Sequence, residues 1–266
     1  MADSKLKLIY FSPTRTTRRV LDAVAKGFGA GELTVFDVTR EEGVPQDFDC
    51  ANDDLVIIGT PVYAGRVPAI ALERLASLKG AGVPAVLVVV YGNRAFDDAL
   101  LELKDFSAEA GFKPVAAAAF IGEHSYSTKV TPVAVGRPDA GDIVKAEEFG
   151  RELAVMFQRG KWDNGVGLNV PGANPYKERV NRALVAPFSQ GNCELCGACE
   201  RVCPTGAITV GVEVVTDADN CILCCACVKV CTNDSRKMEV PRVLEISKWL
   251  STNCAERREP DVFLAQ

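Results

Sequence analysis

The chain has 266 residues, of which 48% are hydrophobic and 24% are charged, and its formal net charge is -5. This composition is typical of a packed globular protein and argues against disorder. The acidic balance and the lack of any Lys- or Arg-rich run argue against DNA or RNA as a partner. No apolar run approaches the roughly 18 residues of a membrane span. Residues 1–5 lack the pattern of a signal peptide, so we expect a cytoplasmic protein.

The first 160 residues alternate short apolar runs with amphipathic stretches, a pattern that predicts an α/β fold with a doubly wound parallel sheet. The predicted strands are 5–12, 33–38, 55–60, 83–91 and 114–121. The predicted helices are 17–27, 69–78, 97–110 and 142–158. Residues 40–53 are too polar and too short to predict a helix between the second and third strands.

The segment after residue 160 is rich in Gly, Asn and Pro and is interpreted as a linker. We predict that a basic helical segment at 176–184 interrupts it. After the cysteine-rich region that follows, the pattern predicts a short helix beyond Pro241 and an extended tail at 259–266. The expected domains are therefore 1–160, a linker at 161–188, a cysteine-rich domain at 189–240 and a tail at 241–266.

Nine of the eleven cysteines fall between Cys193 and Cys231. Because the cytosol keeps thiols reduced, we interpret them as metal ligands and not as disulfides. Eight of them form two copies of one spacing, in which three cysteines recur at every third residue and a fourth follows four residues later. The first copy is Cys193, Cys196, Cys199 and Cys203, and the second is Cys221, Cys224, Cys227 and Cys231.

This spacing resembles that of two-cluster ferredoxins, in which three cysteines of a run bind one 4Fe-4S cluster and the fourth binds the other. The resemblance assigns Cys193, Cys196, Cys199 and Cys231 to cluster I, and Cys221, Cys224, Cys227 and Cys203 to cluster II. Zinc sites are the alternative, but zinc modules separate two CxxC pairs and do not run three cysteines at this spacing. We expect Cys225 to be a non-ligand, either a small apolar residue or an S–H donor toward a cluster sulfur, and Cys50 and Cys254 to have no redox role.

The first predicted strand runs into a hydroxyl-rich loop and then a helix. Such a loop offers backbone N–H groups, hydroxyls and a helix N-terminus to an anion. It resembles the phosphate loop of flavodoxins, which binds the phosphate of FMN; a helix capped by a threonine run is the alternative. The candidate phosphate-binding residues are Ser12, Thr14, Arg15, Thr16 and Thr17.

Two more loops follow predicted strand ends, where open α/β sheets bind ligands. They resemble the two flavin-ring loops of the flavodoxin-like family, and their candidate residues are Thr60, Pro61, Val62, Tyr63, Tyr91, Gly92, Asn93 and Arg94. Tyr63 could stack on the flavin ring, although an aromatic loop residue can equally serve packing. Backbone groups of Gly92 and Asn93 could meet the polar edge of the ring. Arg66 and Arg94 are expected to place positive charge beside it.

His124, the only histidine, follows the fifth predicted strand and so lies at the same edge of the sheet. A histidine there could donate a proton to reduced flavin or to a substrate, so it is the catalytic candidate, against the alternative of a bystander.

Taken together, the chain resembles the ferredoxin-flavodoxin fusion family, known as EFR-type ferredoxins. The resemblance implies a flavodoxin-like FMN-binding domain, a small α+β two-cluster ferredoxin domain, and electron transfer between FMN, two 4Fe-4S clusters and protein redox partners. The alternative is an FMN-dependent reductase of a small substrate that the clusters supply with electrons. A homodimer is left open.

Overall fold

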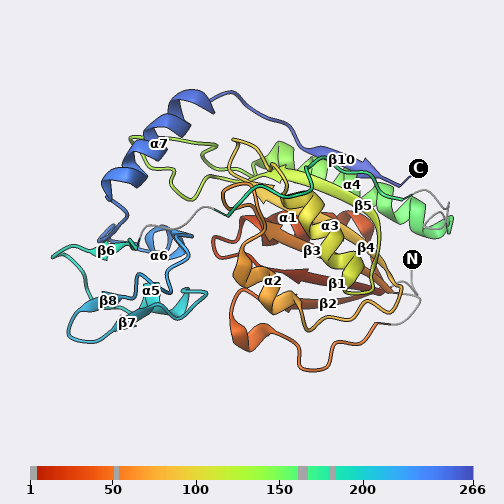
Figure 1. Cartoon of the computed structure of the whole chain (residues 1–266), viewed down its shortest axis with the longest axis horizontal. Helices are drawn as coiled ribbons and strands as arrows, with labels where there is room; N and C mark the ends of the chain where they lie inside the picture. Colours follow the sequence, from red (N-terminus) through yellow and green to blue (C-terminus); the bar gives the residue numbers. More distant parts are fainter. Residues whose placement is uncertain (1–4, 51–53, 161–166, 180–183, 266) are drawn as a thin grey trace.

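The computed structural model describes residues 5–50, 54–160, 167–179 and 184–265. Its larger part is an α/β sheet with helices on both faces, and a smaller cysteine-rich module lies beyond one edge of that sheet (Figure 1). None of the described helices is long and apolar enough to cross a membrane.

Five parallel strands form the sheet in the order β5-β4-β3-β1-β2. They are β1 (Lys5–Tyr10), β2 (Glu32–Asp37), β3 (Asp54–Pro61), β4 (Pro84–Tyr91) and β5 (Lys113–Ile121). The order β2-β1-β3-β4-β5 is that of flavodoxin-like folds, which bind ligands where the strand order reverses, beyond the ends of β1 and β3. The central strands β3 and β4 are apolar and almost fully buried, as expected for a sheet covered on both faces.

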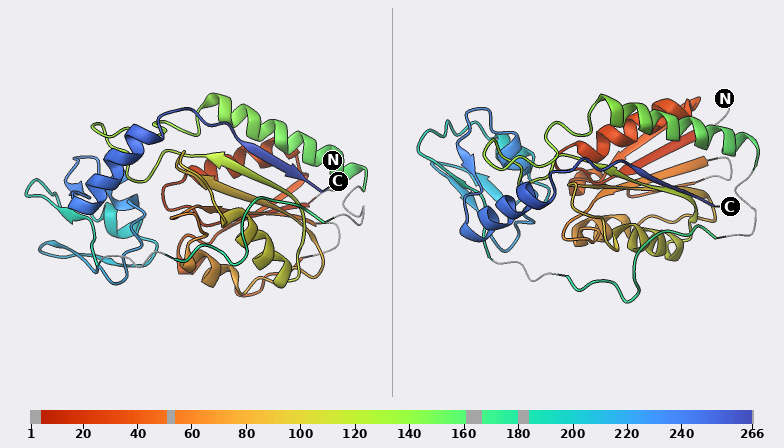
Figure 2. Two further views of the ribbon diagram at one scale, coloured as in Figure 1. Left: turned by 45° about the horizontal axis from the view of Figure 1, so that its top comes forward. Right: turned by 90° about the horizontal axis from the view of Figure 1, so that it is seen from above.

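Two helices cover each face of the sheet. One face packs against α1 (Thr16–Phe28) and α4 (Ala140–Gln158), and the other against α2 (Ala69–Leu75) and α3 (Ala99–Glu109) (Figure 2). These helices confirm the predicted pattern, although α2 ends three residues earlier than predicted. Between β2 and β3 the described residues form only a 3-10 turn at Glu41–Gly43, in agreement with the expectation of no full helix there.

The cysteine-rich module is a small α+β unit. It contains the short helices α5 (Ala198–Arg201) and α6 (Ala226–Lys229), the β6–β9 pair (Phe188–Ser189 with Arg236–Lys237) and the β7–β8 hairpin (Ile208–Val210 with Val214–Thr216). Its small core includes three cysteines, Cys199, Cys203 and Cys227. A core this small gives a module little stability of its own, so bound cofactors are expected to supply much of it.

The end of the chain returns to the sheet. Helix α7 (Pro241–Asn253) leads away from the cysteine-rich module, and β10 (Asp261–Leu264) pairs antiparallel with β5 (Figure 1). The predicted extended tail is thus a sixth strand. The predicted helix at 176–184 is wrong over 176–179, which are not helical, and 180–183 lie outside the described residues.

Polar contacts from three side chains help to tie the two parts together. Arg74 of α2 donates hydrogen bonds to the carbonyls of Val38, Thr39 and Pro204, and Lys229 of α6 forms an ion pair with Glu123 after β5. The third contact is a hydrogen bond of 2.6 Å from Arg40 to the carbonyl of Arg201. Together they hold the cysteine-rich module against the edge where the parallel strands end.

Candidate functional site

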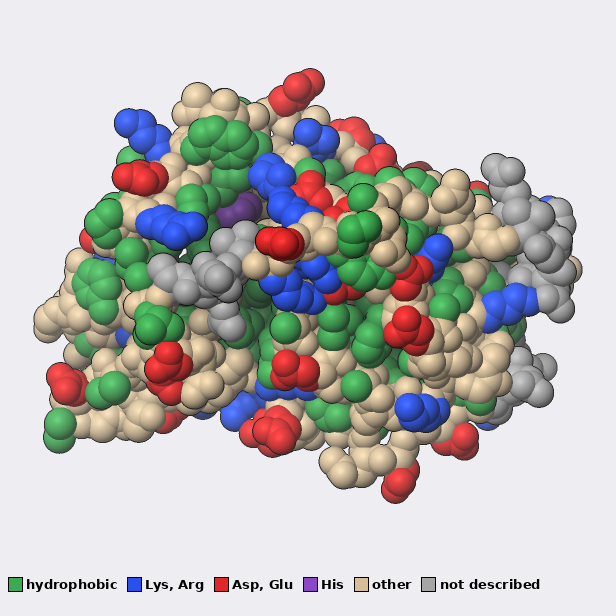
Figure 3. Space-filling view, viewed as in Figure 1, with side chains coloured by type: hydrophobic (Ala, Val, Ile, Leu, Met, Phe, Trp, Pro, Cys, Tyr) green, Lys and Arg blue, Asp and Glu red, His purple; other side chains and the backbone are tan. Residues whose placement is uncertain are grey.

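A cavity of about 470 Å³, here called the edge cavity, lies at the carboxyl ends of the parallel strands. Its walls come from the loops after β1, β3, β4 and β5, from the second cysteine run and from α7. Its volume lies in the range of small-molecule sites. Figure 3 shows the single histidine at the bottom of a hollow, with Lys and Arg side chains beside it.

The loop after β1 contributes Thr14 and Thr16 to the edge cavity. Thr17 lies just behind them; it is fully buried, and its hydroxyl has no hydrogen-bond partner among the described residues. The first N–H groups of a helix also lack intrahelical partners. Free donors and an orphaned hydroxyl at the start of α1 fit a bound phosphate.

Two predicted phosphate ligands face elsewhere. Ser12 and Arg15 line a different hollow on the far side of the loop, and the Ser12 hydroxyl accepts a hydrogen bond of 3.1 Å from the backbone N–H of Arg18. Arg15 adopts a left-handed backbone with φ of 64°, which is the conformation that favours glycine.

The two predicted ring loops line the edge cavity through Pro61, Val62, Tyr63, Tyr91, Gly92 and Arg94. Thr60 is fully buried behind them. The side chain of Asn93 turns away and donates hydrogen bonds of 2.7 and 2.8 Å to the carbonyls of Cys254 and Glu256. Arg66 does not line the edge cavity, and its guanidinium forms a paired contact with Glu102.

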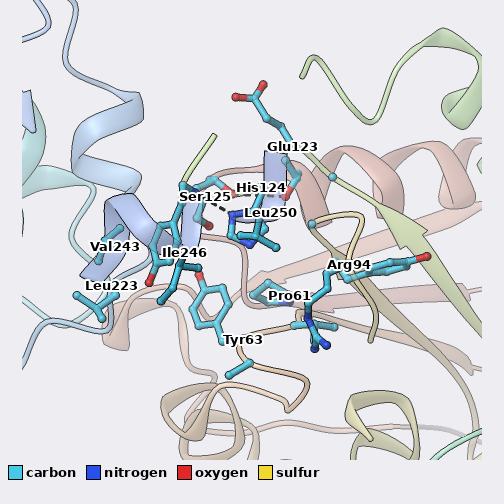
Figure 4. Close-up of a pocket in the computed structure, with 18 of the residues that line it drawn as sticks. Pro61, Tyr63, Arg94, Glu123, His124, Ser125, Leu223, Val243, Ile246 and Leu250 are labelled. Carbon is cyan, nitrogen blue, oxygen red and sulfur yellow. Dashed lines mark hydrogen bonds between the residues drawn. The ribbon is translucent and has the colours of Figure 1, made fainter. Parts of the chain in front are cut away.

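His124 faces the edge cavity, close to Leu250, with Leu223, Val243 and Ile246 on one side and Pro61 and Arg94 on the other (Figure 4). Its Nδ1 accepts a hydrogen bond of 3.0 Å from the backbone N–H of Tyr126, so the proton of the neutral ring is on Nε2. Burial, with Lys229 and Arg94 nearby, lowers the pKa of His124 to about 4. The imidazole is therefore a neutral hydrogen-bond donor near pH 7.

The imidazole also depends on a glycine. A Cβ built on Gly92 would stand 2.3 Å from Cδ2 of His124, far inside van der Waals contact. A side chain at this position would therefore displace the ring, which gives the predicted glycine of the second ring loop a steric role.

Two tyrosines lie between the edge cavity and the second cysteine run. Burial raises the pKa of Tyr63 well above its usual value, and the nearby Cys224 and Cys225 raise it further. The pKa of Tyr126 is raised by burial and by cysteines of the same run. Both phenols stay neutral, and the edge cavity and the second cysteine run share these side chains as a common wall.

The eight cysteines of the two runs line two small cavities. Cys193, Cys196, Cys199 and Cys231 line the first cysteine cavity, and Cys203, Cys221, Cys224 and Cys227 line the second. Each cavity thus takes three cysteines from one run and the fourth from the other, and all eight are free thiols. Within the described ranges no three Cys, His, Asp or Glu side chains converge on a single ion. A 4Fe-4S cluster instead takes one thiolate at each iron, so its ligands surround a hollow.

Cys225 has a particular backbone. It occupies the place that Gly197 has in the first run, and both residues are left-handed, with φ of 56° and 72°. Its buried thiol lies next to the second cysteine cavity, which already has four other cysteines.

Sequence reasoning missed much of the edge cavity. The walls that it did not foresee include Ile222, Leu223, Tyr126, Arg242, Val243, Ile246, Trp249 and Leu250. The apolar spacing of α7 predicted a helix, but nothing local indicates that its apolar face covers a site formed more than a hundred residues earlier.

Comparison with known proteins bears on the two parts separately. Residues 186–209 match the family model of the 4Fe-4S binding domain. No curated protein matched the chain. Similar solved structures include a flavodoxin from the domain Archaea (13% identity, TM-score 0.39), the flavodoxin WrbA-like protein of Agrobacterium tumefaciens (16%, 0.41) and a flavodoxin of Streptococcus pneumonia (20%, 0.38). They align with 58%, 59% and 57% of this chain, respectively, and each is covered over 99% of its own length.

At these TM-scores the structural similarities support no argument about this chain. The flavodoxin-like assignment rests on the strand order. The 4Fe-4S assignment rests on the matched family model and the cysteine spacing. A flavodoxin-like sheet followed by a 4Fe-4S binding region is the arrangement of a flavodoxin-ferredoxin fusion, and this chain fits that class.

Proposed function

We propose that the chain is an electron-transfer protein that binds FMN in the edge cavity and two 4Fe-4S clusters in the cysteine cavities, and exchanges electrons with protein redox partners. FMN takes up one or two electrons, whereas each cluster passes one. A chain that binds both cofactors would therefore connect two-electron with one-electron transfer. One observation carries the proposal: the edge cavity is lined both by the loops at the end of the parallel sheet and by Ile222 and Leu223 of the second cysteine run.

For FMN, the support comes from two ends of the edge cavity. The start of α1, with Thr14, Thr16 and the orphaned Thr17 hydroxyl, would hold the phosphate. The apolar and aromatic walls at the other end, which include Tyr63 and Tyr91, would hold the ring and exclude water. The neutral His124 would donate a hydrogen bond from Nε2, and Arg94 of the same cavity forms an ion pair with Asp97, which Lys177 shares.

For the clusters, the support is the donor set of each cysteine cavity. Four thiols line the first hollow and five line the second, Cys225 among them; each hollow contains three cysteines at the repeat positions of one run and the fourth of the opposite run. Cys196 and Leu195 of the first run are exposed, whereas Cys224 and Cys227 of the second are buried next to the edge cavity. Electrons would therefore enter or leave by cluster I at the surface and reach the flavin by cluster II.

Anaerobic reconstitution with iron, sulfide and FMN tests this proposal. We expect about eight irons and one FMN per chain, since each cluster holds four irons. Reduction of the clusters should then be followed by reduction of the flavin within the same molecule, at a rate independent of protein concentration. About four irons per chain, zinc in place of iron, or a flavin that fails to bind would contradict the proposal.

Replacement of the fourth cysteines tests the exchange between the runs. Cys203→Ala should damage the cluster of the second run and Cys231→Ala that of the first, because each lines the opposite cavity. Cys225→Ala is the matched control and should leave about eight irons bound, since four other cysteines line the same hollow. If each substitution damaged only the cluster of its own run, the fourth cysteine would not bind the cluster of the opposite run.

An FMN-dependent reductase remains the second candidate, and the position of His124 on the edge cavity favours it. His124→Gln keeps a side-chain N–H donor but removes the imidazole. A reductase that uses the imidazole to move a proton should lose turnover by roughly 10²-fold or more, while FMN stays bound. Unchanged turnover with a saturable small acceptor would assign His124 to hydrogen bonding alone.

A further inference from the structure

Arg236 of β9 is the largest fully buried side chain among the described residues, with 1% of its surface exposed. Its guanidinium donates hydrogen bonds to the Thr216 hydroxyl at 2.8 Å, the Pro187 carbonyl at 3.0 Å and the Ser189 hydroxyl at 3.1 Å. These acceptors are all uncharged. Its Nε has no hydrogen-bond partner among the described residues.

A buried arginine without an anionic partner is costly. Moving a cation out of water is strongly unfavourable unless an opposite charge and hydrogen bonds compensate it. The buried Arg137 shows the usual solution, because it is paired with the carboxylate of Asp142. No Asp or Glu of the described residues forms an ion pair with Arg236, so the compensating negative charge has to come from something else.

The surroundings of Arg236 identify that charge. Arg236 lines the first cysteine cavity, and its guanidinium also lies 3.9 Å from Sγ of Cys227, which lines the second. The side chain therefore stands between the two hollows. A 4Fe-4S cluster with four thiolate ligands carries net negative charge, and hydrogen bonds to its sulfurs tune its potential.

We propose that Arg236 is the shared counter-ion of both 4Fe-4S clusters and holds both reduction potentials up. This proposal rests on the two clusters of the proposed function. A cation at close range favours the more negative, reduced form of each cluster, and burial keeps this attraction from being screened by water. Nε is the donor left free for a cluster sulfur.

An anaerobic redox titration of the reconstituted protein, followed by electron paramagnetic resonance, tests the role of the charge. Arg236→Met should lower the equilibrium constant for reduction of each cluster by about tenfold or more, which is 59 mV for a one-electron step. Arg236→Lys keeps the charge but not the fork of donors, and its potentials should lie between those of wild type and Arg236→Met. Arg201→Met is the matched control, since it removes an exposed arginine that lies between two cysteines of the first run.

Iron content separates the possible outcomes. Normal iron in Arg236→Met, with potentials that move no further than in Arg201→Met, would overturn the shared counter-ion and leave the two-cluster proposal standing. If Arg236→Met fails to take up clusters, the Arg236→Lys variant decides between the explanations. Cluster assembly in Arg236→Lys supports the role of the charge. If neither variant assembles clusters, Arg236 is needed for packing and the proposal is overturned. A wild-type protein without 4Fe-4S clusters would overturn both proposals.

Discussion

At the scale of single residues, buried polar atoms without partners point to the chemistry of this chain. Such atoms are rare in folded proteins, and each calls for an explanation. The Thr17 hydroxyl lies at the start of α1, one residue after Thr16 of the edge cavity, and Arg236 Nε lies between the cysteine cavities. Both are explained if the atom is satisfied by a bound group, phosphate in one case and a cluster in the other.

Thr17→Val separates the free and bound states. In the protein without FMN, the change removes an unsatisfied hydroxyl, so the free energy of unfolding should stay the same or rise. FMN affinity should fall by about tenfold, the loss of one hydrogen bond to a charged group. Flavin fluorescence quenching measures the affinity. Ser107→Ala, which removes another buried unpartnered hydroxyl on α3, should leave FMN affinity unchanged; equal losses in both variants would contradict a phosphate contact by Thr17.

The protonation of His124 can be followed directly because the chain has one histidine. Its pKa is lowered to about 4 by burial, with Lys229 and Arg94 nearby, against about 6.5 in an unfolded chain. The unfolded chain therefore binds the proton first, and the folded state should lose stability as pH falls from about 6.5 to 4. Nitrogen NMR of the labelled imidazole should show a neutral ring with its proton on Nε2 down to about pH 5. A titration midpoint near 6.5 would show a solvated ring instead.

At the scale of elements, the five parallel strands and the four helices that cover the sheet were predictable because apolar runs and amphipathic periods are local signals. The prediction of a helix at 176–184 was wrong over 176–179 because contacts with distant residues determine the conformation of this segment. Asp98 accepts a hydrogen bond from the backbone N–H of Lys177, and Glu102 binds the guanidinium of Arg179. These carboxylates of α3 and its N-cap hold the segment extended, and a partner so far away in sequence leaves no local pattern.

The sequence predicted an extended tail but not that β10 pairs with the sheet. Asn93 offers a test of how this strand is held in place. Its side-chain amide donates to the carbonyls of Cys254 and Glu256, and its backbone is left-handed with φ of 64°. Asn93→Gly tolerates that backbone but removes both of these hydrogen bonds and the one that Asn93 Oδ1 accepts from the backbone N–H of Arg258, so the β10 amides should exchange hydrogen about tenfold faster or more. Gly136→Asn, at a left-handed glycine with open space around it, is the control for a change of loop residue. Unchanged exchange in Asn93→Gly would mean that the Asn93 hydrogen bonds do not hold β10 in place.

At the scale of the whole molecule, the sequence predicted the two halves of the site but not how they meet. The cysteine spacing and the strand-end loops are each contained in short stretches, whereas the edge cavity combines the β1–α1 loop with Leu223 and Leu250. The edge cavity therefore forms only when the tertiary contacts place the cysteine-rich module against the sheet. The functional consequence is the short separation between the second cysteine run and the edge cavity.

Arg74 is the contact expected to matter most for that position. It is almost fully buried, and it bridges carbonyls of the β2 end to the carbonyl of Pro204, at 2.5 Å. In Arg74→Met these carbonyls lose a charged donor in a buried place, so the free energy of separating the two parts should fall by about 2–3 kcal/mol. Lys229→Gln breaks a half-exposed ion pair with Glu123 and should cost less than about 1 kcal/mol. Hydrogen exchange at 204–207 in the reconstituted protein measures both variants, and an effect of Lys229→Gln as large as that of Arg74→Met would show that surface charge, and not the buried arginine, holds the two parts together.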